Sequence, residues 1–356
     1  VVPMATSASG AGKLAFTIRE PVGVVGAISP FNFPLNLVAH KLAPAIAAGC
    51  PVVLKPAEKT PLSALLLAQT LRDAGLPSGA LQIVFGDGGA IGGALVDHPD
   101  VPLISFTGSV PVGWAIRARQ PEKRVALELG NSTPVIVADD ADLELAATRI
   151  AASGFTHAGQ SCISAQRVYV QRTVADEFTA RLAARVDALR LGDPLDDATD
   201  VGPVIDAAAK ERVLAWLGEA IDAGASVLSG GGERDGMIEP TLLSQITPDM
   251  RVSCEEVFGP VVGIADYDTP DEAVRLANGS PFGLQAGIFT ARVDRALTMA
   301  RTLTFGAVTI NETPTFRADQ QPYGGVKRSG NTYEGPRYAI AEMTDERLVI
   351  MQLPTG

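Results

Sequence analysis

The chain has few of the residues that build disulfide frameworks and metal centres. Its 356 residues include only 3 cysteines and 3 histidines, at positions 50, 162 and 254 and at positions 40, 98 and 157. They are too far apart in the sequence to give the short ligand spacings of a zinc site or a dense disulfide pattern. We therefore expect no metal, and a reducing cytoplasm in which a thiol stays available for chemistry.

Long apolar runs and an excess of positive charge are also absent. No uninterrupted apolar run approaches the roughly 18 residues of a membrane span, and residues 1–12 do not resemble a signal peptide. The net charge of −11 disfavours nucleic acid and anionic membranes as partners. Because only 5% of the residues are aromatic, the core must consist mainly of Ala, Val, Leu and Ile.

The sequence does contain a regular alternation of short apolar runs and helical patterns. Strands are predicted at residues 22–28, 51–55, 81–86, 103–108, 124–130 and 134–139. A helix at 35–49 closes at Gly49, and Thr60 followed by Pro61 predicts the start of another. This alternation predicts an α/β fold with a doubly wound parallel sheet, in which ligands lie at the carboxyl ends of the strands.

A second β/α region follows. An amphipathic helix at 141–155 leads into a loop that contains Cys162, and a strand at 167–171 and a helix at 174–190 come after it. Later, 322–330 is a glycine-rich loop, and 347–354 is expected to form an exposed strand that needs a partner.

Cys162 has two interpretations. An isolated cysteine is most often a small buried hydrophobe. However, the small residues Gly159, Ser161 and Ser164 around it would let a substrate approach a nucleophile.

Two further polar residues have similar alternatives. Glu128 lies near the end of a strand that we expect to be buried on both faces, where a carboxylate is costly unless it is used or paired. Asn32 lies at a strand-to-helix turn, where it either caps the turn or donates its amide to a developing negative charge.

Several positions suit a phosphate-containing ligand. Ser109 opens a helix directly after a strand, and helix N-termini attract phosphate. The glycine-rich turn that starts at Gly86 is a loose match to a dinucleotide pattern. Lys55 and Glu58 follow another strand, where Glu58 could bind ribose hydroxyls; both could equally be solvated surface charges.

Seven segments together give a much more specific signal. In chain order they are PFNFP, KPAEKTP, FTGS, LELG, GQSC, EEVFGP and PYGGVKRSG. They resemble the signature motifs of the aldehyde dehydrogenase superfamily, in the family's order and over essentially the whole chain. The resemblance implies an NAD(P)-dependent, non-acylating enzyme that oxidises an aldehyde to a carboxylic acid.

The resemblance also implies catalytic roles. Cys162 attacks the aldehyde as a thiolate, and Asn32, with the backbone N–H of Cys162, stabilises the oxyanion. Hydride passes to the nicotinamide and leaves a thioester, and Glu128 is the general base for the hydrolytic water.

The cofactor contacts are implied in the same way, at Lys55, Glu58, Gly86, Gly108, Ser109, Gly130, Glu256 and Phe258. Lys55 and Glu58 hold the adenosine ribose, and Ser109 lies by the pyrophosphate. Glu256 binds the nicotinamide ribose, and Phe258 packs near its ring. A carboxylate at position 58 would repel a 2′-phosphate, so NAD is expected rather than NADP.

The substrate signal is weaker. Asn36 and His40 follow Asn32 on one helical face, and Arg317 lies in a loop that borders the substrate tunnel in the family. Together they could hold an anionic group, and these segments are similar to the lactaldehyde, phosphonoacetaldehyde and sulfolactaldehyde branch. Alternatively, Arg317 pairs with a local carboxylate such as Asp319.

The expected organisation follows from the same resemblance. Residues 1–21 form an oligomerisation hairpin, 22–130 the NAD-binding domain, 131–335 the catalytic domain and 336–356 a C-terminal oligomerisation arm. The arms favour a homodimer or homotetramer. Relatives usually carry a further N-terminal part of the cofactor domain, so we expect an exposed sheet edge.

The sequence departs from the family's pattern at Asn131, and two other functions stay open. Asn131 stands where many relatives have glycine, and we expect it to tolerate a left-handed backbone. An acylating or acyl-phosphate-reducing relative generally lacks the glutamate found here at position 128. A catalytically impaired homologue with a structural role is the remaining alternative.

Overall fold

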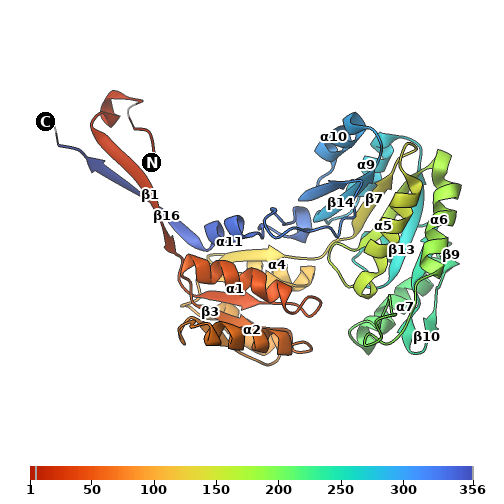
Figure 1. Ribbon diagram of the computed structural model, residues 1–356, viewed down its shortest axis with the longest axis horizontal. Helices are drawn as coiled ribbons and strands as arrows, with labels where there is room; N and C mark the ends of the chain where they lie inside the picture. The colour runs from red at the N-terminus through yellow and green to blue at the C-terminus, as the bar shows by residue number, and fades with distance from the viewer. Residues whose placement is uncertain (5, 355–356) are drawn as a thin grey trace.

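The computed structural model describes residues 1–4 and 6–354, which form two α/β units and a two-stranded arm that projects from them (Figure 1). The first unit contains a 5-stranded parallel sheet in the order β4-β3-β2-β5-β6. Its strands are β2 (Val25–Ile28), β3 (Val52–Lys55), β4 (Leu81–Ile83), β5 (Leu103–Thr107) and β6 (Arg124–Glu128). The order reverses between β2 and β5, which confirms the doubly wound topology.

Helices follow the strands of this sheet. They are α1 (Asn36–Ala48), α2 (Leu62–Asp73), α3 (Gly93–Asp97), which continues the helical turn η2 (Gly88–Gly92), and α4 (Val110–Arg119). The apolar face of α1 packs in the core with β2 and β3, and the helix ends at Gly49 in the left-handed conformation. Before α2, the Thr60 hydroxyl donates to the Phe31 carbonyl at 3.2 Å and does not cap the helix.

The second unit contains a 7-stranded sheet in the order β15-β14-β7-β8-β13-β12-β9. Its strands are β7 (Thr133–Val137), β8 (Ala165–Gln171), β9 (Ser226–Ser229), β12 (Thr241–Ser244), β13 (Val261–Tyr267), β14 (Gln285–Phe289) and β15 (Ala307–Ile310). All neighbours are parallel except β9 and β12. A short ladder of β10 (Glu233–Arg234) and β11 (Met237–Ile238) lies apart.

The helices of the second unit are α5 (Leu143–Phe155), α6 (Ala175–Asp187), α7 (Ala207–Asp222), α8 (Arg251–Cys254), α9 (Pro270–Asn278) and α10 (Val293–Thr302). The Asp142 carboxylate accepts the Leu145 N–H at 3.0 Å, so it caps α5. Ile150 and Phe155 of α5 are fully buried with Phe178 of α6 against the sheet.

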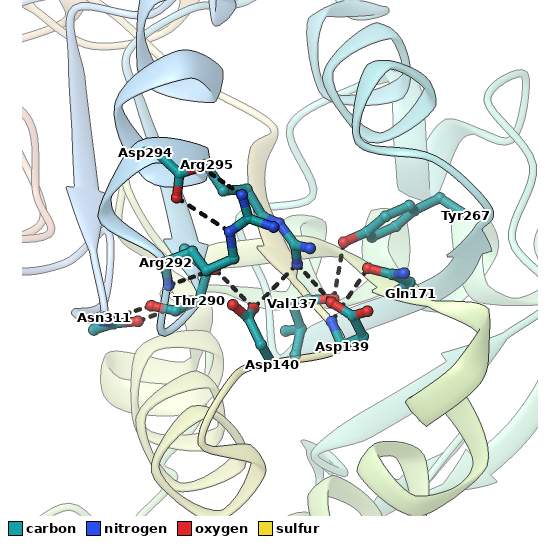
Figure 2. A network of polar contacts seen from close by, with 10 residues as sticks. All are labelled: Val137, Asp139, Asp140, Gln171, Tyr267, Thr290, Arg292, Asp294, Arg295 and Asn311. Atoms are coloured by element: carbon teal, nitrogen blue, oxygen red, sulfur yellow. Dashed lines mark hydrogen bonds and ion pairs between the residues drawn. The ribbon is translucent and has the colours of Figure 1, made fainter.

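A polar network closes the carboxyl end of this second sheet, as Figure 2 shows. Arg295 forms ion pairs with Asp139 and Asp140, which follow β7. The Tyr267 hydroxyl at the end of β13 donates to the Val137 carbonyl at 3.2 Å. These contacts link the ends of β7 and β13 on either side of β8. The candidate site described below lies at the opposite, amino ends of the strands.

The end of the chain returns to the first unit. The Asn331 amide accepts the Leu127 N–H at 2.8 Å and donates to the Val125 carbonyl at 2.9 Å, so it pairs with the edge of β6. Helix α11 (Pro336–Glu342) then packs on α1. The second unit is therefore an insertion into the first.

The arm differs from the expected hairpin within the first residues of the chain. Strand β1 (Lys13–Pro21) pairs antiparallel with β16 (Thr344–Gln352) along its whole length. The N-terminal segment folds back only at an isolated bridge between Val2 and Ala15. The strand expected in the hairpin thus pairs with the tail of the same chain, and the assignment of residues 1–21 to oligomerisation stays a prediction.

Other elements were predicted at the right place, but their predicted ends lie beyond the observed ones. The strand expected at 81–86 ends at Ile83, and the helix expected at 174–190 ends at Asp187. Within the described residues, no helix combines the length and the apolar character that crossing a bilayer requires.

Candidate active site

The carboxyl ends of the strands in the first sheet face the amino ends of the strands in the second sheet. Phe31, which follows β2, packs edge-to-face against Phe258, which precedes β13, with ring centroids 5.8 Å apart. The Asn32 side chain donates to the Gln160 carbonyl, before β8, at 2.9 Å. Segments far apart in the sequence therefore meet between the two units.

A strained turn places Cys162 at this edge. His157, Ala158 and Gly159 have φ values of 58°, 54° and 69°, a left-handed run that L-residues seldom adopt. A Cβ on Gly159 would lie 2.1 Å from the Gly259 carbonyl oxygen, so this backbone approach requires glycine.

The small residues around Cys162 therefore have structural roles that we had not expected. Gly159 is required by backbone packing, and the buried Ser164 hydroxyl lies 3.1 Å from the carbonyls of Ser153 and Gly154. Of the three, only Ser161 shares the partial exposure of Cys162, and the path for substrate stays a prediction.

The Cys162 thiol lies in a mainly apolar setting. Burial raises the pKa of the thiol to about 12, although a contact of 2.9 Å with the Tyr323 hydroxyl opposes the shift. The resting group is therefore a thiol, and its attack as a thiolate requires hydrogen-bond or electrostatic stabilisation.

The Asn32 amide is placed to stabilise an oxyanion that forms next to Cys162. One of its two amide N–H groups is used by the Gln160 carbonyl, and its carbonyl oxygen is buried without a partner among the described residues. The second N–H can donate to an oxyanion, as can the Cys162 N–H, which makes no hydrogen bond within the described part of the chain.

Glu128 ends β6 in a buried position. Neither of its carboxylate oxygens meets a hydrogen-bond partner within residues 1–4 and 6–354. Burial, and then the charge of Glu334, raises the pKa of Glu128 well above its ordinary value. A buried carboxylate with no partner and a raised pKa suits a general base.

Lys41 was not predicted. It lines a small cavity with Glu128 and Glu334, and its ammonium donates to the Ser105 and Thr107 hydroxyls at 3.1 and 2.7 Å. Burial lowers the pKa of Lys41. A lysine within an apolar helix carried no signal, because only the fold brings β5 and β6 beside it.

Glu256 lies against the segment that follows β6. Its carboxylate accepts the Asn131 N–H at 3.1 Å, and a Cβ on Gly130 would lie 2.1 Å from its Oε2 atom. Burial raises the pKa of Glu256 to about 7.

Asn131 does not adopt the left-handed backbone that we considered. Its side chain donates to the Thr133 hydroxyl at 2.8 Å and to the Gln285 carbonyl at 3.0 Å. The amide therefore ties β7 to β14, which explains why a side chain is useful at this position.

The remaining cofactor candidates share the carboxyl edge of the first sheet. Lys55 contacts Glu58 at 2.9 Å after β3, and a Cβ on Gly88 would lie 3.5 Å from the Glu58 carboxylate. The turn that begins at Gly86 follows β4 and therefore lies beside Glu58. Gly108 and Ser109 separate β5 from the start of α4, where Ser109 occupies the N-cap position.

The substrate candidates do not all meet. His40 and Arg317 do: the Arg317 guanidinium lies 2.6 Å from the Nδ1 atom of His40. Arg317 also pairs with Glu334 at 2.8 Å, whereas Asp319 lies 3.6 Å from His40. The carboxylate that pairs with Arg317 is thus not the local one that we considered. Asn36 is exposed, one turn before His40.

Glu334 and Tyr323 are the other residues that were not predicted. Burial alone would raise the pKa of Glu334, but the His40 hydrogen bond and the charges of Lys41 and Arg317 hold it below its ordinary value. The Arg317 guanidinium carbon lies 3.8 Å from the centre of the Tyr323 ring. Tyr323 lies in the glycine-rich segment 322–330, and no sequence pattern marks its hydroxyl as functional.

Comparison with known proteins decides the family. Residues 2–349 match the aldehyde dehydrogenase family. The chain belongs to this family. A 3-sulfolactaldehyde dehydrogenase of Priestia aryabhattai is 48% identical over 353 residues, which cover 99% of this chain and 74% of that protein. A lactaldehyde dehydrogenase of Methanococcus maripaludis is 41% identical over 342 residues, or 95% of this chain and 73% of the relative.

Solved aldehyde dehydrogenases have the same fold. The NADP-dependent glyceraldehyde-3-phosphate dehydrogenase of Bacillus halodurans C-125, complexed with NADP, matches with a TM-score of 0.96 at 41% identity, over 99% of this chain and 74% of its own. Aldehyde dehydrogenase 21 of Physcomitrella patens, complexed with the product succinate, gives 0.95 at 40% identity, over 99% and 73%. The predicted family and fold are confirmed, whereas the preference for NAD stays a prediction.

Proposed function

We propose that this aldehyde dehydrogenase oxidises a small polar or anionic aldehyde to its carboxylic acid, with Cys162 as the nucleophile. The observation that carries the proposal is the meeting of Cys162, Asn32 and Glu128 at one junction between the two units. The Asn32 amide bonds to the backbone two residues before Cys162. The charge of Glu128 acts on the Cys162 thiol.

The chain's own groups support each part of this reaction. The Cys162 thiolate attacks the aldehyde carbon, and the free N–H of Asn32 and the Cys162 N–H donate to the oxygen as it becomes negative. The thioester that remains after oxidation needs a water molecule at its carbonyl carbon. Glu128, unpartnered among the described groups, removes a proton from that water.

The residues present fit a nicotinamide dinucleotide. A Cβ on Gly130 would collide with the Glu256 carboxylate, so glycine leaves room for this carboxylate, whose oxygens are acceptors that suit ribose hydroxyls. When bound, the dinucleotide supplies the acceptor for the aldehyde's hydride. Glu256 would hold the nicotinamide ribose, Lys55 and Glu58 the adenosine ribose, and the start of α4 the pyrophosphate.

The preference for NAD rests on Glu58. Its carboxylate is half-exposed beside Lys55 and would repel a 2′-phosphate. We expect Glu58→Gln to raise kcat/KM with NADP at least about tenfold relative to that with NAD, because one repulsive charge is removed. Glu122→Gln, on the exposed surface, is the control. An unchanged cofactor ratio in Glu58→Gln contradicts this assignment.

The anionic substrate group is assigned to Arg317 and His40. Glu334 occupies one end of the Arg317 guanidinium, but the Nε atom is buried without a partner in the described part of the chain. That donor suits a carboxylate, phosphonate or sulfonate oxygen. The relatives named for sulfolactaldehyde and lactaldehyde support a short polar substrate. Faster turnover of hexanal or benzaldehyde than of short anionic aldehydes contradicts it.

The first experiment measures NADH formation at 340 nm with the purified protein and a panel of short aldehydes. Cys162→Ala removes the nucleophile and is expected to abolish the signal, whereas Cys254→Ala, at another free cysteine, keeps it. Equal rates in the parent and Cys162→Ala contradict the mechanism. No turnover by the parent, despite cofactor binding, would favour a structural role.

We further infer that the chain works in the cytoplasm as a homodimer or homotetramer. The three cysteines are free, which suits a reducing compartment. Half-exposed apolar side chains on the β1–β16 arm, such as Leu348 and Ile350, suit contact with a second copy.

A further inference from the structure

The Tyr323 hydroxyl is the one polar group of the described residues in hydrogen-bond contact with the Cys162 sulfur, 2.9 Å away. The ring is 3% exposed and packs with Ile163 and Leu284. A buried tyrosine hydroxyl normally has a hydrogen-bond partner. Here the partner is the atom that the proposed reaction uses as its nucleophile.

The position of Tyr323 is fixed by its own backbone. Its N–H donates to the Glu334 carbonyl at 3.1 Å, and the Glu334 N–H donates to the Tyr323 carbonyl at 2.6 Å. This antiparallel bridge and the surrounding apolar side chains hold the ring, so the hydroxyl is aimed at the sulfur without further ordering.

The direction of the hydrogen bond depends on the state of the sulfur. In the resting thiol either atom can donate, but a thiolate only accepts. After ionisation the Tyr323 O–H must therefore be the donor, and hydrogen bonds to charged groups are stronger than those to neutral ones. The Arg317 guanidinium over the ring withdraws electron density and makes the phenol a better donor.

We propose that Tyr323 is a further catalytic residue, whose hydroxyl donates a hydrogen bond to the Cys162 thiolate and so stabilises the ionised nucleophile relative to the thiol. The proposal rests on the assignment of Cys162 as the nucleophile. It gives Tyr323 a task that a phenylalanine of the same shape could not perform.

The test measures the thiol directly, without substrate turnover. Cys162 is alkylated with iodoacetamide from pH 8 to 10.5, below the pKa of the thiol, where the rate follows the thiolate fraction, and mass spectrometry of the Cys162 peptide separates it from Cys50 and Cys254. We expect Tyr323→Phe to lower the alkylation rate about tenfold at each pH. Oxidation of aldehyde at pH 7.5 should fall about tenfold.

Two controls keep the result interpretable. Tyr267→Phe removes another buried hydroxyl, which donates to the Val137 carbonyl, and should leave the profile unchanged. Replacement of Tyr323 by 3,5-difluorotyrosine keeps the ring and makes the phenol a stronger donor, so it should raise the alkylation rate at pH 8.

Three results would overturn the role of Tyr323: the same alkylation rate in Tyr323→Phe as in the parent, a change equal to that in Tyr267→Phe, or no change at pH 8 with the fluorinated residue. The readout does not depend on the aldehyde. A parent enzyme without dehydrogenase activity would contradict the proposed function while leaving the alkylation result intact.

Discussion

At the scale of the residue, the site is marked by buried polar groups that lack partners in the described structure. The Glu128 oxygens, the Asn32 carbonyl and the Arg317 Nε atom all have this property. Such groups oppose folding unless they are satisfied. At the junction between the two units, a bound substrate or cofactor can supply the missing partners.

The first prediction concerns turnover. Glu128→Gln keeps the shape of the side chain but removes the base, so hydrolysis of the thioester should slow by about 10²–10⁴-fold. Acylation of Cys162 does not need this base, and intact-protein mass spectrometry should therefore find the acyl-enzyme. Glu122→Gln should behave like the parent. Full steady-state activity in Glu128→Gln would exclude Glu128 as the base.

The second prediction concerns stability and pH. Since burial raises the pKa of Glu128, the folded chain binds this proton more tightly than the unfolded chain does. Its contribution to stability therefore falls as pH rises above the unfolded pKa. At pH 8, Glu128→Gln should be more stable than the parent by about 1–3 kcal/mol, and the difference should shrink toward pH 5. Urea unfolding at both pH values measures it, and a pH-independent difference contradicts it.

At the scale of the element, the strands were predictable and their ends were not. The runs around β3, β5 and β6 are almost entirely buried, so apolar sequence sufficed to locate them. β4 ends early because the chain turns after Ile83 into the loop before η2. The sequence did not predict the left-handed backbone before Cys162, because His157 and Ala158 have no preference for that conformation.

The third prediction tests that turn. Gly159→Ala places a Cβ against the Gly259 backbone in a left-handed residue, and should destabilise the chain by about 1–3 kcal/mol. Gly218→Ala is the matched control. It lies on the exposed face of α7 with open space around it, and should stabilise by about 0.5–1 kcal/mol. Denaturant unfolding of both variants measures this, and equal effects would contradict the strain.

At the scale of the whole molecule, the sequence predicted the family and the central residues but not their surroundings. Cys162, Glu128 and Asn32 stood out as polar groups in short motifs. Lys41 and Glu334 did not, because Lys41 binds hydroxyls of β5 that lie 64 and 66 residues further along the chain, and Glu334 meets α1 only when the chain returns to the first unit. Contacts across such separations leave no local pattern in a single sequence.

The fourth prediction concerns assembly. If the β1–β16 arm contacts a second copy, the double substitution Leu348→Lys and Ile350→Lys should shift the mass measured by light scattering to a smaller species, because both side chains are half-exposed on the arm. Leu195→Lys, in a loop at 91% exposure, is the control. The same mass for the parent and the arm variant would remove the arm from the interface.

The insertion of the second unit has a consequence for synthesis. A ribosome releases residues 25–128 first, yet the pairing of Asn331 with β6, the packing of α11 on α1 and the partner strand of β1 come from residues 331–352. The inserted unit has its own sheet and core, so it can fold while the growing polypeptide is still attached. The unit whose translation begins first is therefore the unit whose folding is completed last.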